Sequence, residues 1–149
     1  MYAKSNEQVA EYCGLIRQLN LEYEEYARTV GLTHSSLRTL SIIYDNPDGC
    51  SQKTICDHSF LPKQTVNAIV TGFLKQGVIK LTELKTDRRR KTIRLTKRGL
   101  EYINPLFSKI KNAENKAMES LDAGQRAALL ENTRLYLANF HERMKDDSK

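Results

Sequence analysis

Basic side chains gather in one stretch of the chain, from Leu61 to Gly99. This stretch holds eleven lysines and arginines against two acids, Glu83 and Asp87, although the net charge of the whole chain is only +6. The residues before it are net negative, and the positive and negative charges after it balance. A basic field confined to one segment indicates a polyanionic partner, of which nucleic acid is the commonest.

The first part of this stretch, residues 62–76, predicts a helix. Its apolar residues recur at the spacing of one buried helix face: Val66, Ile69, Val70, Phe73 and Leu74. Pro62 suits the first helical turn and Gly77 suits the C-terminal stop. The opposite face carries short or amide-bearing groups and no carboxylate that would repel phosphate. We predict contacts to base edges and phosphates from five side chains: Lys63, Gln64, Thr65, Asn67 and Thr71.

Two strand-like runs follow this helix, at residues 78–84 and 91–95. A turn that contains Thr86, Asp87 and three arginines joins them. A helix followed by a hairpin with a cationic tip is the layout of a winged helix, and we expect Arg88, Arg90 and Lys91 to lie against phosphates. If the turn were a solubilising loop instead, three consecutive arginines would repel one another with nothing to neutralise them.

The order of these residues resembles a known family. Asp87-Arg88-Arg89, followed by Leu95-Thr96-Lys97-Arg98-Gly99, is similar to the D-x-R…L-T-x-x-G signature of MarR-type winged helix-turn-helix regulators. Leu74-Lys75-Gln76-Gly77-Val78-Ile79 resembles that family's end of the recognition helix and first wing strand. The resemblance implies that Arg89 enters a DNA minor groove and that Asp87 pairs with it to hold the wing tip. A narrow minor groove concentrates negative potential, which favours an inserted guanidinium.

The elements before the basic stretch complete a helix-turn-helix unit. We predict a long helix over residues 5–30 that Gly31 ends, a second helix capped by Thr33, and a turn at residues 46–49. Ser51 then caps a short third helix, residues 52–58, with a break before the recognition helix. Ser51 and Gln52 are candidate phosphate contacts at the start of that helix, although capping explains Ser51 equally well.

Helical patterns return after Gly99. Pro105 should bend the first of these helices, and Asp122 and Gln125 have the spacing of a capping box before the last one. The apolar stripes of the first helix and of the last two have too little partner surface in one chain. We therefore predict a two-fold dimer, which the family resemblance also implies.

These elements predict a mainly α fold with a small β wing, in a single MarR-type domain over residues 1–149. A winged helix-turn-helix DNA-binding lobe covers about residues 33–99, and long N- and C-terminal dimerisation helices cover about residues 5–30 and 100–145. The composition is that of an ordinary globular protein. The chain has no apolar run of membrane-spanning length and no signal-peptide pattern at its start, so we expect a cytoplasmic protein with no membrane partner.

Cys13 leaves two readings open. Some members of the family that the chain resembles sense peroxides through a cysteine near this position flanked by tyrosines, and Tyr12 adjoins Cys13. A buried structural cysteine explains the same residue. Cys50, Cys56 and His58 lack zinc-finger spacing, and we find no catalytic motif, so we predict no metal, no cofactor and no enzymatic activity.

Together these patterns predict a homodimeric, sequence-specific transcriptional regulator that binds double-stranded DNA at a pseudo-palindromic operator. We expect a repressor, although the residues themselves leave repressor and activator open. Its two recognition helices would enter successive major grooves about 34 Å apart. The resemblance implies release by a small-molecule effector. Two alternatives are a thiol-based redox-sensing regulator that uses Cys13 and a winged-helix module for protein–protein contact.

Overall fold

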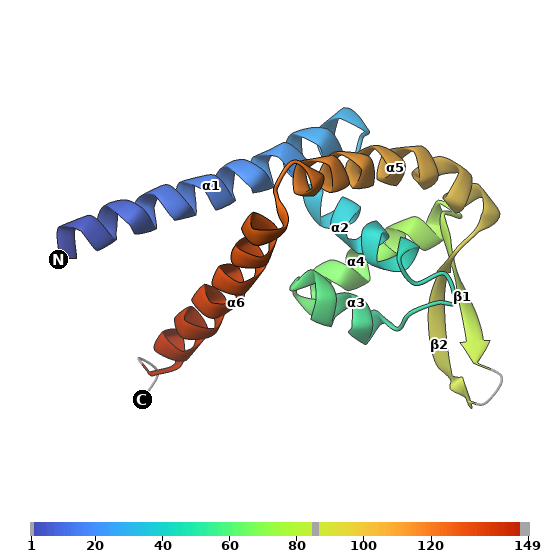
Figure 1. The fold of residues 1–149 in the computed structure, drawn as a ribbon. Coiled ribbons are helices and arrows are strands. Elements are labelled where there is room, and N and C mark those ends of the chain that lie inside the picture. Colours follow the sequence, from blue (N-terminus) through green and yellow to red (C-terminus); the bar gives the residue numbers. More distant parts are fainter. Residues whose placement is uncertain (1, 85–86, 147–149) are drawn as a thin grey trace. The chain divides into compact units, whose positions relative to one another are not determined.

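The computed structural model describes the backbone of residues 2–84 and 87–146 and the side chains of residues 5–83 and 91–145. Helices dominate this part of the chain, and one antiparallel hairpin interrupts them (Figure 1). The elements are α1 (Tyr2–Thr29), α2 (His34–Tyr44), α3 (Gln52–Ser59), α4 (Lys63–Lys75), β1 (Ile79–Leu84), β2 (Asp87–Leu95), α5 (Lys97–Glu119) and α6 (Ala123–Asp146). The predicted mainly α fold with a small β wing is confirmed.

The chain forms two compact units, Met1–Leu106 and Phe107–Lys149. The first unit contains α1 to α4, the hairpin and the beginning of α5. The second contains the rest of α5 and α6. The boundary falls inside α5, directly after Pro105 and Leu106.

The core of the first unit lies between α2, α3, α4 and the base of the hairpin. Its fully or almost fully buried side chains are Leu37, Leu40, Ile43, Ile55, Val66, Val70, Phe73, Val78, Ile79 and Ile93. The predicted stripe of α4 is confirmed, with Ile69 and Leu74 half-buried at its edges. This stripe fixes which face of α4 is turned toward solvent.

The predicted caps at Thr33 and at Asp122 and Gln125 are confirmed by their hydrogen bonds. Thr33 Oγ1 accepts from the backbone N–H of Ser36 at 3.1 Å. In the second unit Asp122 and Gln125 form a reciprocal capping box, with N–H···O distances of 2.9 and 2.8 Å. Pro62 is the N-cap residue of α4 instead of its first helical residue, so α4 begins at Lys63.

The hairpin differs from the sequence prediction in the start of its second strand. β2 begins at Asp87 instead of Lys91, so Asp87 and the three arginines belong to the strand and not to the turn. Glu83 pairs with Lys91 and Leu84 pairs with Asp87, which leaves the arginines between successive pairs as a bulge. The alternation of apolar residues stops at the arginines, whereas backbone pairing continues because it does not depend on apolar side chains. The sequence pattern therefore predicted too short a second strand.

Candidate nucleic-acid interface

The corner between α3 and α4 sets the direction in which α4 leaves the core. Phe60, the C-cap of α3, has left-handed backbone angles of φ 55° and ψ 26°, and its N–H donates to the carbonyl of Cys56 at 3.1 Å. Ser59 is fully buried, and its Oγ accepts from the N–H of Leu61 at 3.2 Å. These local bonds close a short turn between the two helices, which is the geometry of a helix-turn-helix.

The predicted reading face of α4 is turned toward solvent. Lys63, Gln64, Asn67 and Thr71 are exposed, and Thr65 is half-buried. The chain has no acidic residue between Phe60 and Glu83. The face therefore presents amide, hydroxyl and ammonium groups, which suit base edges and phosphates.

A groove of about 880 Å³ lies between α3 and α4. Residues from both helices line it: Gln52, Lys53, Cys56, Lys63, Gln64 and Asn67. It brings four of the predicted residues together, since Gln52 of α3 lies on the same groove as Lys63, Gln64 and Asn67 of α4. Sequence reasoning missed Lys53 and Cys56, although the four-residue spacing between Gln52 and Cys56 places those two on one side of α3.

One cation of this groove is already paired. Lys53 Nζ lies 2.5 Å from Asp57 Oδ2, in an exposed ion pair one helical turn apart. The hydrogen bond with Asp57 and the charge of its carboxylate raise the pKa of Lys53 above its usual value. Lys53 therefore stays protonated, and a phosphate would compete with Asp57 for it.

Ser51 and Gln52 have different surroundings at the start of α3. Ser51 Oγ accepts from the N–H of Thr54 at 3.0 Å and lies 2.9 Å from Thr54 Oγ1. This hydroxyl therefore caps α3, as the sequence predicted. Gln52 lines the groove and is the stronger phosphate candidate of the two.

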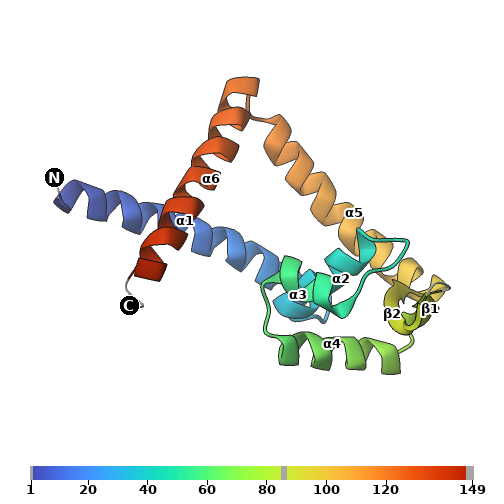
Figure 2. The ribbon, with the colours of Figure 1, turned by 90° about the horizontal axis from the view of Figure 1, so that it is seen from below.

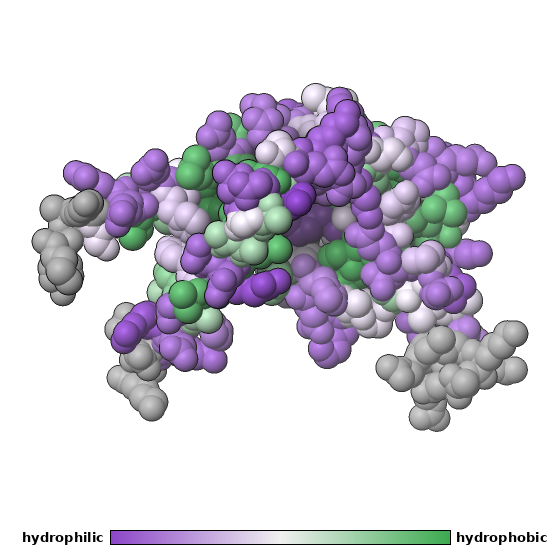
Figure 3. Space-filling view, viewed as in Figure 1, coloured by the Kyte–Doolittle hydropathy of each residue, from purple (hydrophilic) through white to green (hydrophobic). Residues whose placement is uncertain are grey.

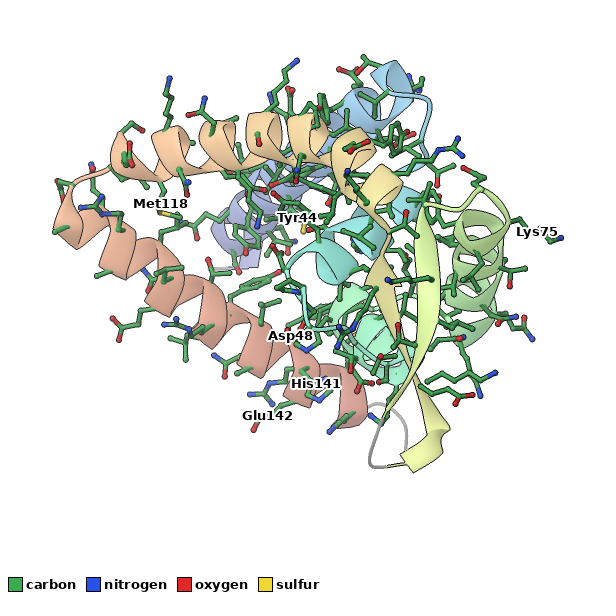
Figure 4. The ribbon with its side chains drawn as sticks, turned by 90° about the vertical axis from the view of Figure 1, so that its right-hand side faces the viewer. Tyr44, Asp48, Lys75, Met118, His141 and Glu142 are labelled. Atoms are coloured by element: carbon green, nitrogen blue, oxygen red, sulfur yellow. The ribbon has the colours of Figure 1, made fainter. Side chains whose placement is uncertain are left out.

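The hairpin projects from the C-terminal end of α4. Figure 2 shows its two strands end-on, next to that end of the helix. Lys75 extends from the same end of α4 away from the body of the chain (Figure 4). Lys91 is exposed and pairs in register with Glu83. The side chains of Asp87, Arg88, Arg89 and Arg90 lie outside the described residues.

A short β-bridge joins the base of the hairpin to the start of the helix-turn-helix. The N–H of Cys50 donates to the carbonyl of Ile93 at 3.1 Å, and the N–H of Ile93 donates to the carbonyl of Cys50 at 2.7 Å. The Cys50 side chain is buried there, and burial raises the pKa of its thiol. This cysteine is therefore a structural residue.

The predicted L-T-x-x-G motif is the junction between α4, the hairpin and α5. Thr96 Oγ1 donates to the carbonyl of Gly77 at 2.7 Å and accepts from the N–H of Gly99 at 2.9 Å. The N–H of Thr96 donates to the carbonyl of Val78 at 3.0 Å. A Cβ atom on Gly99 would lie 2.0 Å from that same carbonyl oxygen, so the close approach requires glycine. The motif thus fixes the wing next to α4.

The remaining chemical candidates are placed as follows. Cys13 is half-buried on α1. Among the described residues, no cluster of three or more histidine, cysteine, aspartate or glutamate side chains could hold a metal ion. No described helix combines the length and the apolar character needed to cross a membrane.

Comparison with known proteins connects the helix-turn-helix part of the chain to a family. Residues 30–90, which include α2, α3, α4 and β1, match the model of the MarR family. No curated protein matches the chain.

Several solved structures share the fold of this chain. A MarR family regulator from Neisseria meningitidis has a TM-score of 0.76 at 23% identity, with 96% of this chain and 97% of that chain covered. An S. aureus MepR variant bound to an oligodeoxyribonucleotide has a TM-score of 0.56 at 18% identity, with 89% and 97% covered. The PcaV regulator from Streptomyces coelicolor, in complex with its natural ligand, has a TM-score of 0.61 at 22% identity, with 83% and 89% covered.

Proposed function

We propose that this chain is a MarR-family winged helix-turn-helix transcription regulator and that it acts as a homodimeric repressor on a pseudo-palindromic operator. The observation that carries the proposal is the exposed, acid-free face of α4 beside the groove shared with α3. The basic hairpin follows directly at the end of the same helix. A duplex needs a cationic surface of this kind, since neutralised phosphates release their counterions.

The proposed contacts divide between two grooves of the DNA. α4 would lie in the major groove, with Gln64, Asn67 and Thr71 toward base edges and Lys63 toward a phosphate. Gln52 and the backbone at Ser51 would meet the flanking phosphates. The arginines at the start of β2 would reach the adjacent minor groove.

Exposed apolar side chains support the homodimer. α1 leaves Val9, Leu15, Ile16, Leu19 and Leu21 between 41% and 58% exposed, and hydrophobic patches are visible along α1 and along α6 (Figure 3). On α6 the exposed residues include Leu130, Leu137, Phe140 and Met144. A second copy of the chain would cover such stripes.

Release by a small ligand is part of the proposal. PcaV is solved with its natural ligand, and a Bordetella bronchiseptica regulator of the same fold, BpsR, is described as regulated in DNA binding by 6-hydroxynicotinic acid. A ligand can change the distance between the two recognition helices only if it binds the conformation with one distance more tightly than the conformation with the other.

Selection of bound sequences from random duplexes tests the proposal. A symmetric homodimer should enrich two inverted half-sites whose centres are about 10–10.5 bp apart. Enrichment of one asymmetric site would contradict the dimer. Failure to bind any duplex at low salt would contradict DNA recognition and favour the protein–protein module.

The wing assignment has its own test. Arg89→Ala should weaken binding to the selected duplex by about tenfold, which corresponds to about 1.4 kcal/mol, and should leave the thermal unfolding temperature unchanged. Arg17→Ala, which removes an exposed arginine of α1, is the matched control. Fluorescence anisotropy measures both dissociation constants. If the two variants bind alike, Arg89 does not contact the DNA.

A further inference from the structure

The corner before α4 is held from α2 by one long side chain. Arg38 Nη1 donates to the backbone carbonyl of Ser59 at 3.1 Å, across 21 residues of sequence. Ser59 is the last residue of α3, and its side chain is fully buried. Carbonyls at a helix end lack helical partners, so this bond satisfies one of them from outside the helix-turn-helix.

Arg38 is in turn held by its neighbour one turn earlier on α2. Arg38 Nη2 lies 3.4 Å from His34 Nε2. A guanidinium has donors and no acceptor, so Nε2 must be the acceptor and the imidazole must be neutral, with its proton on Nδ1. The His34 ring stacks on Tyr23 of α1, with 6.0 Å between centroids and 7° between planes. α1, α2 and the corner are thereby connected in one chain of contacts.

Charged groups on both sides of His34 affect its protonation. Burial lowers the pKa of His34 below the ordinary 6.5, and the Arg38 guanidinium lowers it further, whereas Glu24 of α1 opposes the shift. Glu24 is itself paired with Arg28 at 3.2 Å. Near neutral pH the imidazole is therefore an acceptor. At lower pH it becomes a second cation next to Arg38.

We propose that Arg38 is a positioning residue for DNA binding: its bond to Ser59 fixes the entry of α4, and neutral His34 orients it. α4 begins at the N-cap Pro62, which supplies no side-chain capping bond, so its start depends on the corner. The inference rests on the proposed DNA binding.

Arg38→Ala and Arg38→Lys in the full chain test this role, with the duplex selected by the wild type as probe. The alanine variant should bind roughly tenfold more weakly. Lysine should restore part of the loss, because one ammonium can donate to Ser59 but lacks the second arm of the guanidinium fork. The slope of log Kd against log salt should stay that of the wild type. An arginine on a phosphate would lower that slope by about one when removed. A lowered slope or an unchanged Kd would overturn the proposal.

Asn46→Ala is the matched control for lost stability. Asn46 Nδ2 donates to the carbonyl of Ile42 at 2.8 Å, at the other end of α2, so its removal deletes a side-chain bond away from the corner. Thermal unfolding of both alanine variants gives their losses of stability. If the two alanine variants lose equal stability and Asn46→Ala weakens DNA binding as much as Arg38→Ala, then Arg38 stabilises the fold in general and does not position α4.

His34→Gln tests the pH dependence, because an amide oxygen can accept from Arg38 at every pH. From pH 7.5 to 5.5 the wild-type Kd should rise by several-fold relative to that of His34→Gln. The exposed His58 of α3 is present in both proteins, so any contribution from it cancels in the ratio. The pKa of His34 is lowered in the folded state, so the fold should also lose stability as pH falls below about 6.5. Parallel pH profiles would remove His34 from the proposal.

The failure of the two proposals can be told apart. A wild type that selects no duplex contradicts DNA binding itself. A wild type that binds, with Arg38→Ala binding equally well, contradicts only the positioning role.

Discussion

Phe60 is at once strained and exposed. Its φ of 55° lies in the left-handed region, and 88% of the residue is accessible to solvent. This conformation costs a non-glycine residue roughly 1–2 kcal/mol. Helices often end on glycine at such a position, where no Cβ atom opposes the turn. The bonds at Ser59 and Cys56 hold the corner against this strain, and the exposed ring offers little burial to offset it.

Phe60→Gly should therefore raise the free energy of unfolding by about 1 kcal/mol relative to Phe60→Ala, which keeps the strain. Urea denaturation of both variants measures the difference. Because each variant removes the ring, the comparison isolates the backbone. Equal stabilities would show that the left-handed turn is not strained in this chain.

Among the elements, the hairpin owes its direction relative to α4 to a backbone contact with the start of α5 and not to the pairing of its own two strands. Gly99 at the start of α5 passes so close to Val78 that any side chain would meet the carbonyl oxygen. Thr96 closes the same junction with hydrogen bonds to both sides. The direction of the hairpin therefore depends on these two residues.

Gly99→Ala should destabilise the fold by about 2–3 kcal/mol, because α5 or the start of β1 must move to make room. Gly72→Ala on α4 is the control, since a Cβ atom there would meet nothing within 4 Å. That change should be neutral or stabilising, as alanine is the better helix former. Denaturant unfolding distinguishes the two, and similar losses would contradict the close approach.

Local patterns in the sequence predicted most of these elements, since helix periodicity and caps depend on residues a few positions apart. The stripe of α4 and the caps at Thr33 and Ser51 are of this kind. The predicted start of β2 was wrong, because the length of a strand depends on the partner strand with which its backbone pairs. The groove between α3 and α4 and the bond from Arg38 to Ser59 join residues far apart in sequence, which no local spacing encodes.

The basic charge and the exposed apolar stripes lie on different elements of the chain. The basic stretch of residues 61–99 lies within the first unit, in α4, the hairpin and the start of α5. Exposed apolar stripes lie on α1 and on α6. Each Å² of apolar surface removed from water contributes about 25 cal/mol, so covering these stripes favours association. A dimer would then present two basic surfaces to one duplex.

Leu137→Glu combined with Phe140→Glu on α6 tests this association. Both side chains are more than half exposed and lie three residues apart, on one side of the helix. Two carboxylates in an apolar interface would be left unpaired, so the variant should sediment as a monomer at micromolar concentration.

Asn139→Glu adds one carboxylate at an exposed polar position of α6 and should remain a dimer. The monomeric variant should also bind the selected duplex at least tenfold more weakly, because two half-sites are no longer read by one linked particle. Sedimentation velocity and a DNA titration measure the two effects, with circular dichroism to confirm that α6 stays helical. A helical monomer that binds the full duplex as tightly as the wild type would contradict the homodimer.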